Sequence, residues 1–176
     1  MTVRAQTMMM SNPADVLNYA LTLEHLEYAF YRDGLARFPV ETFRAAGFAA
    51  LVHEMVATIR DDEKAHVDAL AAVVTQLGGT PVEEATYDFG YDDLAGFLRT
   101  AMALENTGVS AYQGAAGDLI DHDDLLTAAL TIHGVEARHA AYLNALNGTS
   151  PFPDAVNPTL TPDEVLKIAG PFVKAS

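Results

Sequence analysis

The chain contains no cysteine among its 176 residues. Without thiolates it cannot build a zinc finger of the usual kind, an iron–sulfur site or a disulfide framework, and the redox compartment stays open. Basic residues are also scarce, because 10 lysines and arginines stand against 24 aspartates and glutamates, a formal net charge of -14. Binding to a phosphate backbone needs a basic face, so this balance argues against a nucleic-acid partner.

Long hydrophobic runs are absent as well. No stretch reaches the roughly 18 consecutive apolar residues of a membrane span, so we expect no membrane partner. The opening residues, MTVRAQTMMM, hold one arginine and no apolar core followed by a small-residue cleavage site. They do not form a complete export signal, which favours a cytoplasmic location, and we expect residues 1–10 to be a flexible tail.

Capping residues and helical periodicity divide the rest of the chain into four long helices, with no convincing strand. A capping side chain followed by Pro13 opens the first helix, and Pro39 lies just beyond its end. Gly78 provides the stop signal of the second helix. The predicted helices span about 11–37, 48–77, 92–117 and 122–146. The sequence therefore predicts an all-α fold.

A proline-rich stretch, TSPFPDAVNP, follows the fourth helix. After it, Thr161 and Pro162 precede two acidic residues, which is a helix-start signal for a short fifth helix. We therefore expect one helical bundle over 11–148 and a tail over 149–176 whose short helix packs on that bundle. A chain of this length fits such a single core without a disulfide.

An internal repeat relates the first two helices to the last two long ones. The string TLEHLEYAFY aligns with ALENTGVSAY, which matches Glu24 with Glu105 and Tyr31 with Tyr112. The string IRDDEKAHVDAL aligns with IHGVEARHAAYL, so a Glu-x-x-His motif occurs once in each half. The two motifs are Glu63 with His66 and Glu136 with His139.

Six residues of this repeat form a set that suits two metal ions. Residues three apart project from the same side of a helix, so each Glu-x-x-His motif presents two ligands to one point. Four glutamates balance the charge of two divalent ions, and two neutral imidazoles complete the ligand shells. Carboxylate with imidazole suits iron or manganese, with zinc as a further candidate. The predicted ligands are Glu24, Glu63, His66, Glu105, Glu136 and His139.

The positions of the glutamates along the helices predict that the ligands of each hairpin lie at the same height in the bundle. In an antiparallel hairpin, residues at the same height are equally far from the turn. The midpoint between Glu24 and Glu63 falls in the break at 38–47, and the midpoint between Glu105 and Glu136 falls in the turn near residue 120. The connection over 78–91 extends to at most ~46 Å, and a crossover between parallel helices here needs ~36 Å.

With these positions in hand, the chain resembles the ferritin-like superfamily, and more closely the ferritin-like domain family that includes plant and bacterial desiccation-related proteins. The resemblance covers about residues 12–174 and rests on LNYALTLEHLEYAFYRDGL, DDEKAHVDAL, ALENTGVSAYQGAA and SPFPDAVNPTLTPDEVLKIAGPF. It implies a four-helix bundle with a long crossover between the second and third helices. It also implies a carboxylate-bridged di-iron or dimanganese centre and a role in oxidative or desiccation stress.

The resemblance assigns a further role to one aspartate. In related bacterial di-iron proteins, an aspartate just before the second-helix glutamate holds a metal-bound histidine, and Asp62 occupies that place. The matching place on the fourth helix is Val135, so this support is expected on one side only. Members of the family often have an export signal.

Four more residues lie near the predicted ligands. Tyr31 and Tyr112 each lie seven positions after a ligand glutamate, and both a hydrogen-bonding core role and a redox role remain open. Glu27 lies one turn from Glu24, and we expect it to be a rim carboxylate, with an extra metal ligand as the alternative. His133 lies one turn before Glu136, and we expect it not to touch the site.

Two classes of function follow. Two neighbouring metal ions can react with O2 or peroxide, which gives ferroxidase or peroxidase activity with iron and catalase activity with manganese. The alternative is a non-catalytic stress-protection protein that the metals hold together. Iron storage in a shell is a weaker third reading. The expected partners are metal ions, O2 and peroxide, with a homodimer as the candidate assembly.

Overall fold

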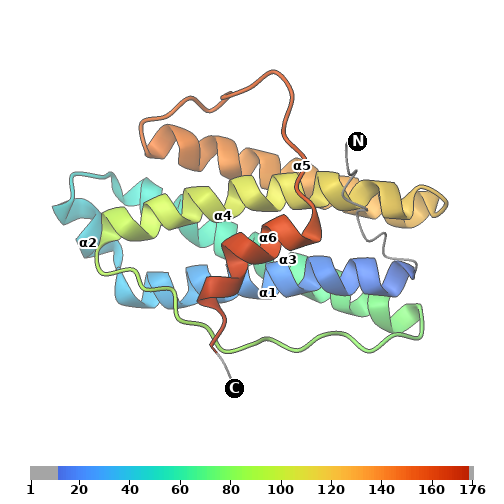
Figure 1. The fold of residues 1–176 in the computed structure, drawn as a ribbon. Helices are drawn as coiled ribbons and strands as arrows, with labels where there is room; N and C mark the ends of the chain where they lie inside the picture. Colours follow the sequence, from blue (N-terminus) through green and yellow to red (C-terminus); the bar gives the residue numbers. More distant parts are fainter. Residues whose placement is uncertain (1–11, 175–176) are drawn as a thin grey trace.

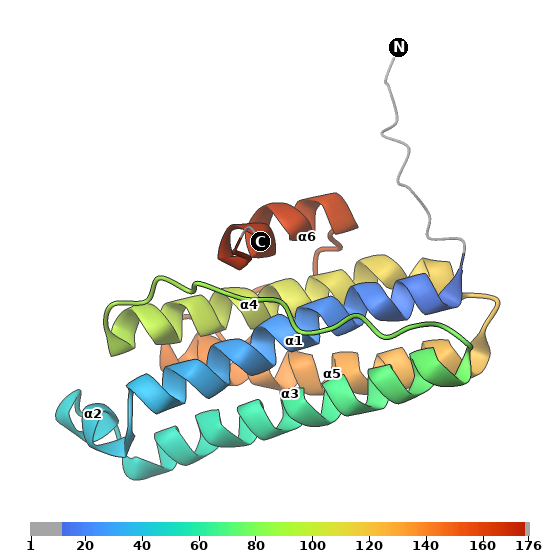
Figure 2. The ribbon, with the colours of Figure 1, turned by 90° about the horizontal axis from the view of Figure 1, so that it is seen from below.

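The computed structural model describes residues 12–174, and their regular structure is helical. The predicted tail over 1–10 lies outside the described residues. The elements are α1 (Pro13–Arg37), α2 (Val40–Ala45), α3 (Ala50–Gln76), α4 (Leu94–Ala115), η1 (Ala116–Leu119), α5 (Asp123–Leu146), α6 (Pro162–Ala169) and η2 (Gly170–Phe172). The four long helices form a bundle of two hairpins, α1 with α3 and α4 with α5 (Figures 1 and 2). The predicted all-α, four-helix architecture is confirmed.

Local signals explain where two of the helices begin. The side chain of Asn12 accepts a hydrogen bond from the backbone N–H of Ala14, and Pro13 occupies the first turn of α1. At α6, Thr161 and Glu164 form a reciprocal capping box. The predicted short fifth helix is therefore present, and its first turn is stabilised before it contacts the bundle.

The break predicted over 38–47 contains the short helix α2, which the sequence analysis missed. Pro39 precedes the first turn of α2, and the side chain of Phe43, a residue of α2, is fully buried. A helix of six residues is too short to show a periodic pattern, so burial of one aromatic ring decides its position.

The long connection between α3 and α4 runs along α1 (Figure 2). The side chain of Asn18 donates to the carbonyl of Thr80 and accepts from the N–H of Val82. Further along, the guanidinium of Arg32 contacts the carboxylate of Glu84 at 2.9 Å. These contacts fasten the crossover to α1, so that α4 returns beside α1 and runs in the same direction as α3.

Two apolar clusters fill the bundle interior on either side of a polar layer. One cluster surrounds Phe30 and Phe97 near α2, and the other surrounds Leu21 and Leu70 near the opposite end. Between them lie the buried glutamates and histidines of the four long helices. Because the clusters close both ends of the layer, its polar groups must find their partners inside the bundle.

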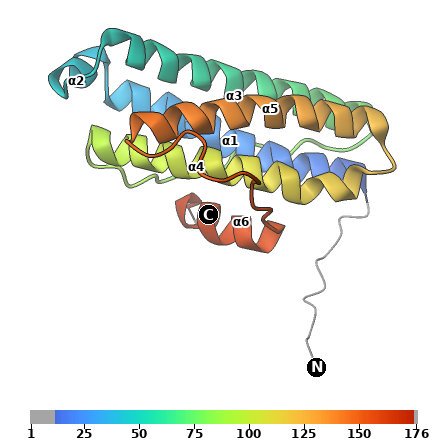
Figure 3. The same cartoon turned by 90° about the horizontal axis from the view of Figure 1, so that it is seen from above.

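The C-terminal segment crosses α4 and then lies over the seam between α1 and α4 (Figures 1 and 3). The N–H of Leu160 donates to the carbonyl of Ser110 at 3.2 Å. A Cβ at Gly114 would overlap the carbonyl of Leu160, so glycine permits this crossing. Within α6, Val165 and Ala169 are buried against the bundle.

Among the helices of residues 12–174, none combines the length and the hydropathy that crossing a bilayer requires.

Candidate metal centre

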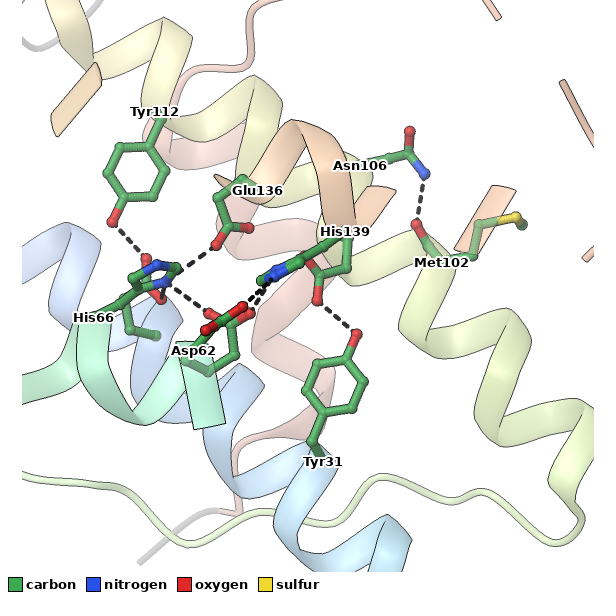
Figure 4. A network of polar contacts seen from close by, with 11 residues as sticks. Tyr31, Asp62, His66, Met102, Asn106, Tyr112, Glu136 and His139 are labelled. Carbon is green, nitrogen blue, oxygen red and sulfur yellow. Dashed lines mark hydrogen bonds and ion pairs between the residues drawn. The ribbon is translucent and has the colours of Figure 1, made fainter. Parts of the chain in front are cut away.

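The six predicted ligands converge in the polar layer at the middle of the bundle (Figure 4). Glu24 comes from α1, Glu105 from α4, and each Glu-x-x-His motif comes from α3 or α5. All four glutamates are fully buried, and His66 and His139 are exposed by only 8% and 6%. Four long helices thus place carboxylates and imidazoles together where water cannot solvate them.

The ligand atoms divide into two overlapping groups, each within 4.8 Å of one another. The first group is Glu24, Glu63, His66 and Glu136, and the second is Glu63, Glu105, Glu136 and His139. The two motif glutamates belong to both groups. This arrangement has two positions for a cation, with two carboxylates shared between them and one carboxylate and one imidazole on each flank.

The nitrogen and oxygen atoms of this layer are better placed to bind cations than to hydrogen-bond with one another. Nδ1 of His139 lies 3.0 Å from Glu63 and 3.3 Å from Glu105, yet it forms no directed hydrogen bond. Both carboxylate oxygens of Glu136 are also buried without a hydrogen-bond partner. Leaving several buried charged groups unsatisfied is costly, and lone pairs that converge on a common point are the arrangement that a bound ion satisfies.

His66 has the corresponding place on the other flank. Its Nδ1 lies 3.1 Å from Glu24, 3.0 Å from Glu63 and 3.4 Å from Glu136. Both imidazoles therefore point the same ring nitrogen at the carboxylates. A neutral imidazole offers a lone pair at that atom, which is what a metal requires.

Burial and mutual repulsion disfavour the charged forms of the central carboxylates. Burial and the charge of Glu105 raise the pKa of Glu63 to about 7. Burial and the charge of Glu63 raise the pKa of Glu136 well above its usual value. Carboxylates packed this closely hold protons unless a cation neutralises them.

The histidines respond in the opposite sense. Burial lowers the pKa of His66, but its contacts with Glu136, Glu24 and Glu63 outweigh burial and raise the pKa to about 12. Burial likewise lowers the pKa of His139, and Glu105 and Glu63 raise it to about 11. Without metal, the imidazolium ions supply part of the positive charge, so metal binding must displace their protons.

The two tyrosines hold the flanking carboxylates in a crossed arrangement. Tyr31 of α1 donates its hydroxyl to Glu105 of α4 at 2.5 Å, and Tyr112 of α4 donates to Glu24 of α1. Burial and then the nearby glutamates raise both phenol pKa values well above 10, so the hydroxyls keep their protons. The hydrogen-bonding role left open by the sequence is present, and it connects the two halves.

Asp62 contacts the histidine of the other half. Its carboxylate lies 3.1 Å from Nε2 of His139, whereas Nδ1 of the same ring is the nitrogen close to Glu63 and Glu105 (Figure 4). This contact fixes which nitrogen of His139 faces the centre. Within residues 12–174, Nε2 of His66 has no such partner, and its expected counterpart position holds Val135.

Glu27 lies inside the bundle, so its predicted position at the rim is wrong. It is only 3% exposed and lies against Gly108 of α4, close to Glu136. The repeat contained the signal, because Gly108 occupies the place in α4 that Glu27 occupies in α1. A glycine facing a glutamate leaves room for the longer side chain.

His133 lies outside both ligand groups, as we expected. Its Nε2 is buried without a hydrogen-bond partner, and burial lowers the pKa of its imidazole. Two other histidines have structural contacts. His25 lies 3.1 Å from the carbonyl of Val82, and His53 packs edge-on against Phe43.

The fold and the buried Glu/His layer define a ferritin-like helical protein, and comparison with known sequences agrees. The chain belongs to the ferritin-like domain family, whose model matches residues 12–149. It is similar to protein rds1 of Schizosaccharomyces pombe, with 28% identity over 139 residues. That match covers 78% of this chain but 33% of the yeast protein, so the chain spans about a third of the length of this relative.

Proposed function

We propose that this chain binds two metal ions in the polar layer, iron foremost, and uses them to react with O2 or peroxide. The observation that supports this most directly is the pair of overlapping ligand groups that share Glu63 and Glu136. These two carboxylates would contribute ligand atoms to both ions. Glu24 and His66 complete one position, and Glu105 and His139 complete the other.

The donor set limits which metals fit. Two imidazoles and several carboxylates, with no thiolate in the chain, suit iron and manganese, with zinc as a non-redox competitor. Bound iron or manganese would supply paired one-electron chemistry toward O2 or peroxide. A ferritin-like family that includes desiccation-related proteins suggests oxidative or desiccation stress as the setting.

The residues of the chain would prepare the site for this chemistry in two ways. The two tyrosine hydroxyls orient the flanking carboxylates, and Asp62 orients His139. The apolar clusters on both sides keep bulk water away from the reacting face.

Metal analysis and turnover assays test this proposal. The natively purified protein should contain close to two equivalents of iron or manganese, and it should consume ferrous iron with O2, or peroxide, catalytically. Glu63→Ala should abolish both the metal content and the turnover, whereas Glu54→Ala, at an exposed position of the same helix, should change neither. Full activity in Glu63→Ala would refute the proposal.

Metal identity separates the redox alternatives. Iron with turnover of ferrous ion or of peroxide with an external donor indicates ferroxidase or peroxidase activity. Manganese with dismutation of peroxide, and no need for a reductant, indicates a catalase.

A structural role for the metals is the second candidate, supported by the unsatisfied buried carboxylate and imidazole atoms. In that case the ions mainly hold the bundle together. Chelation would then lower the melting temperature sharply, and the metal-loaded protein would turn over neither peroxide nor ferrous iron.

A further inference from the structure

Glu27 is a buried carboxylate for which the bundle provides no partner. It is 3% exposed, and within residues 12–174 it forms neither a hydrogen bond nor an ion pair. Burial raises its pKa above the usual value, with the charge of Glu136 as the next cause. A carboxylate buried in this way destabilises the fold unless something else in the site uses it.

The facing residue is glycine, and its missing side chain creates the space that Glu27 fills. A Cβ built on Gly108 would lie 3.2 Å from Oε1 of Glu27 and 2.7 Å from Oε2 of Glu136. The two carboxylates therefore face the same glycine of α4. Any larger residue at 108 would displace the shared carboxylate of Glu136 and crowd Glu27.

The other surroundings of Glu27 are almost entirely apolar. It lines a narrow cavity beneath α6 with Leu23, Leu26, Leu104, Thr107, Gly108 and Ala169. The hydroxyl of Thr107 donates to the carbonyl of Ala103 and so is already engaged within its own helix. Polar partners for Glu27 consequently lie on one side only, toward Glu136 and the ligand groups.

We propose that Glu27 is a seventh metal ligand, a carboxylate that reaches the dinuclear centre through the space left by Gly108. This inference rests on the proposed function, since it requires ions between the two motif glutamates. Glu24 and Glu27 lie three residues apart on α1 and project from the same side of that helix. Helix α1 would then contribute two carboxylates where α4 contributes one.

Cobalt(II) binding to the metal-free protein tests this inference without any activity assay. The wild type should bind two equivalents, with visible absorption bands that report the coordination number. Glu27→Gln should weaken the more weakly held ion by about tenfold or more and change the band intensities, because a carboxylate oxygen leaves the ligand shell. Glu54→Gln removes one glutamate charge from an exposed position of α3 and should leave affinity and bands unchanged.

The metal-free variant provides a folding control. Glu27→Gln removes a buried ionisable group, so the metal-free form should melt no lower than the wild type. If that variant does not fold, Glu27→Asp tests the same contact, because it keeps the carboxylate but shortens its reach by one methylene. It should produce a comparable change in the cobalt bands, and unchanged bands would overturn the inference.

Three outcomes overturn the inference in different ways. Bands and affinity that match the wild type in Glu27→Gln mean that Glu27 is not a ligand, and the dinuclear centre itself stands. Weaker affinity with unchanged bands means that Glu27 acts only as a nearby charge. A wild-type protein that binds no cobalt overturns the proposed function together with this inference.

Discussion

The hairpin of α1 and α3 and the hairpin of α4 and α5 agree in some residues and differ in others. Both contain a flanking glutamate, a Glu-x-x-His motif and a tyrosine seven residues after the flanking glutamate. Two of the differences beside this set concern groups close to the proposed ligands, where Asp62 corresponds to Val135 and Glu27 to Gly108. The shared residues supply the proposed ligands and the tyrosines that hold two of them, and the two differences would make the proposed metal positions unequal.

The contact of Asp62 predicts which of the two proposed ions is bound more tightly. His139 is held by Asp62 of the opposite hairpin, whereas His66 has no corresponding support among residues 12–174. We therefore expect the ion beside His139 to be held more tightly than the ion beside His66. The following predictions test the equivalence of the halves and then their difference, beginning with the largest effect.

Replacement of a shared carboxylate should be far more damaging than replacement of a flanking one. Glu136→Ala removes a ligand from both ligand groups, so both ions should be lost on dialysis. Glu24→Ala affects only the first group and should leave one ion bound beside His139. Elemental analysis after dialysis measures both outcomes. Two retained ions in Glu136→Ala would contradict a bridging role.

Removal of the aspartate support should weaken the metal position beside His139 and leave the difference at Glu27 in place. Asp62→Ala frees Nε2 of His139, and the ion beside it should bind about 10–100-fold more weakly. The ion beside His66 should be unaffected. Stepwise titration calorimetry separates the two constants. Asp61→Ala is the matched control, because the neighbouring carboxylate is 68% exposed and pairs with Arg60.

Adding a carboxylate in the other half should strengthen metal binding beside His66. Val135→Asp supplies a carboxylate at the place that corresponds to Asp62 in the repeat. If it leaves the weaker binding constant unchanged, the correspondence between the halves does not extend to this contact.

The two tyrosines should have equal effects on stability, because the halves agree there. Tyr31→Phe or Tyr112→Phe removes one hydroxyl from a buried carboxylate and should cost about 1.5 kcal/mol. For a chain of this size that corresponds to a fall of roughly 3–6 °C in melting temperature. Calorimetry of the metal-loaded variants measures it. Loss of turnover at unchanged stability would instead indicate an electron-transfer role.

A pH dependence of the metal-free protein is expected as well. The pKa of Glu63 rises from 4.5 to about 7 on folding, so its contribution to stability is full below pH 4.5 and is lost as pH rises through 7. The melting temperature of the metal-free form should therefore fall by several degrees over this range. Glu63→Gln should reduce that slope, and an unchanged slope would assign it to other groups.

Helix geometry explains why the convergence of these six side chains was predictable from the sequence. A helix advances 1.5 Å per residue, so equal distances from a turn place Glu24 beside Glu63 and Glu105 beside Glu136. The duplicated motif then removes most of the ambiguity of a single Glu-x-x-His. The crossover was predictable for a similar reason, because the number of residues in the connection is enough to span the length of the bundle.

Properties that depend on packing between helices were harder to predict from the sequence. The sequence placed Glu27 at the rim, because it does not show which neighbouring helix leaves space for a carboxylate. The helix α2 was missed because a single buried ring, Phe43, decides its position. The sequence suggested that Asp62 holds a histidine, but the structure was needed to identify His139 of the other half.

The crossed tyrosine bonds also bear on how such a chain could arise. One hairpin with a glutamate, a Glu-x-x-His motif and a tyrosine, paired with its own copy about a twofold axis, would form the same six ligands and the same two crossed bonds. In such an ancestral homodimer, positions 27 and 108 would have to be identical, with two glutamates competing for one space or two glycines leaving it empty. Gene duplication and fusion through the crossover would remove that restriction. The first hairpin could then have glutamate at position 27 while the second has glycine at position 108.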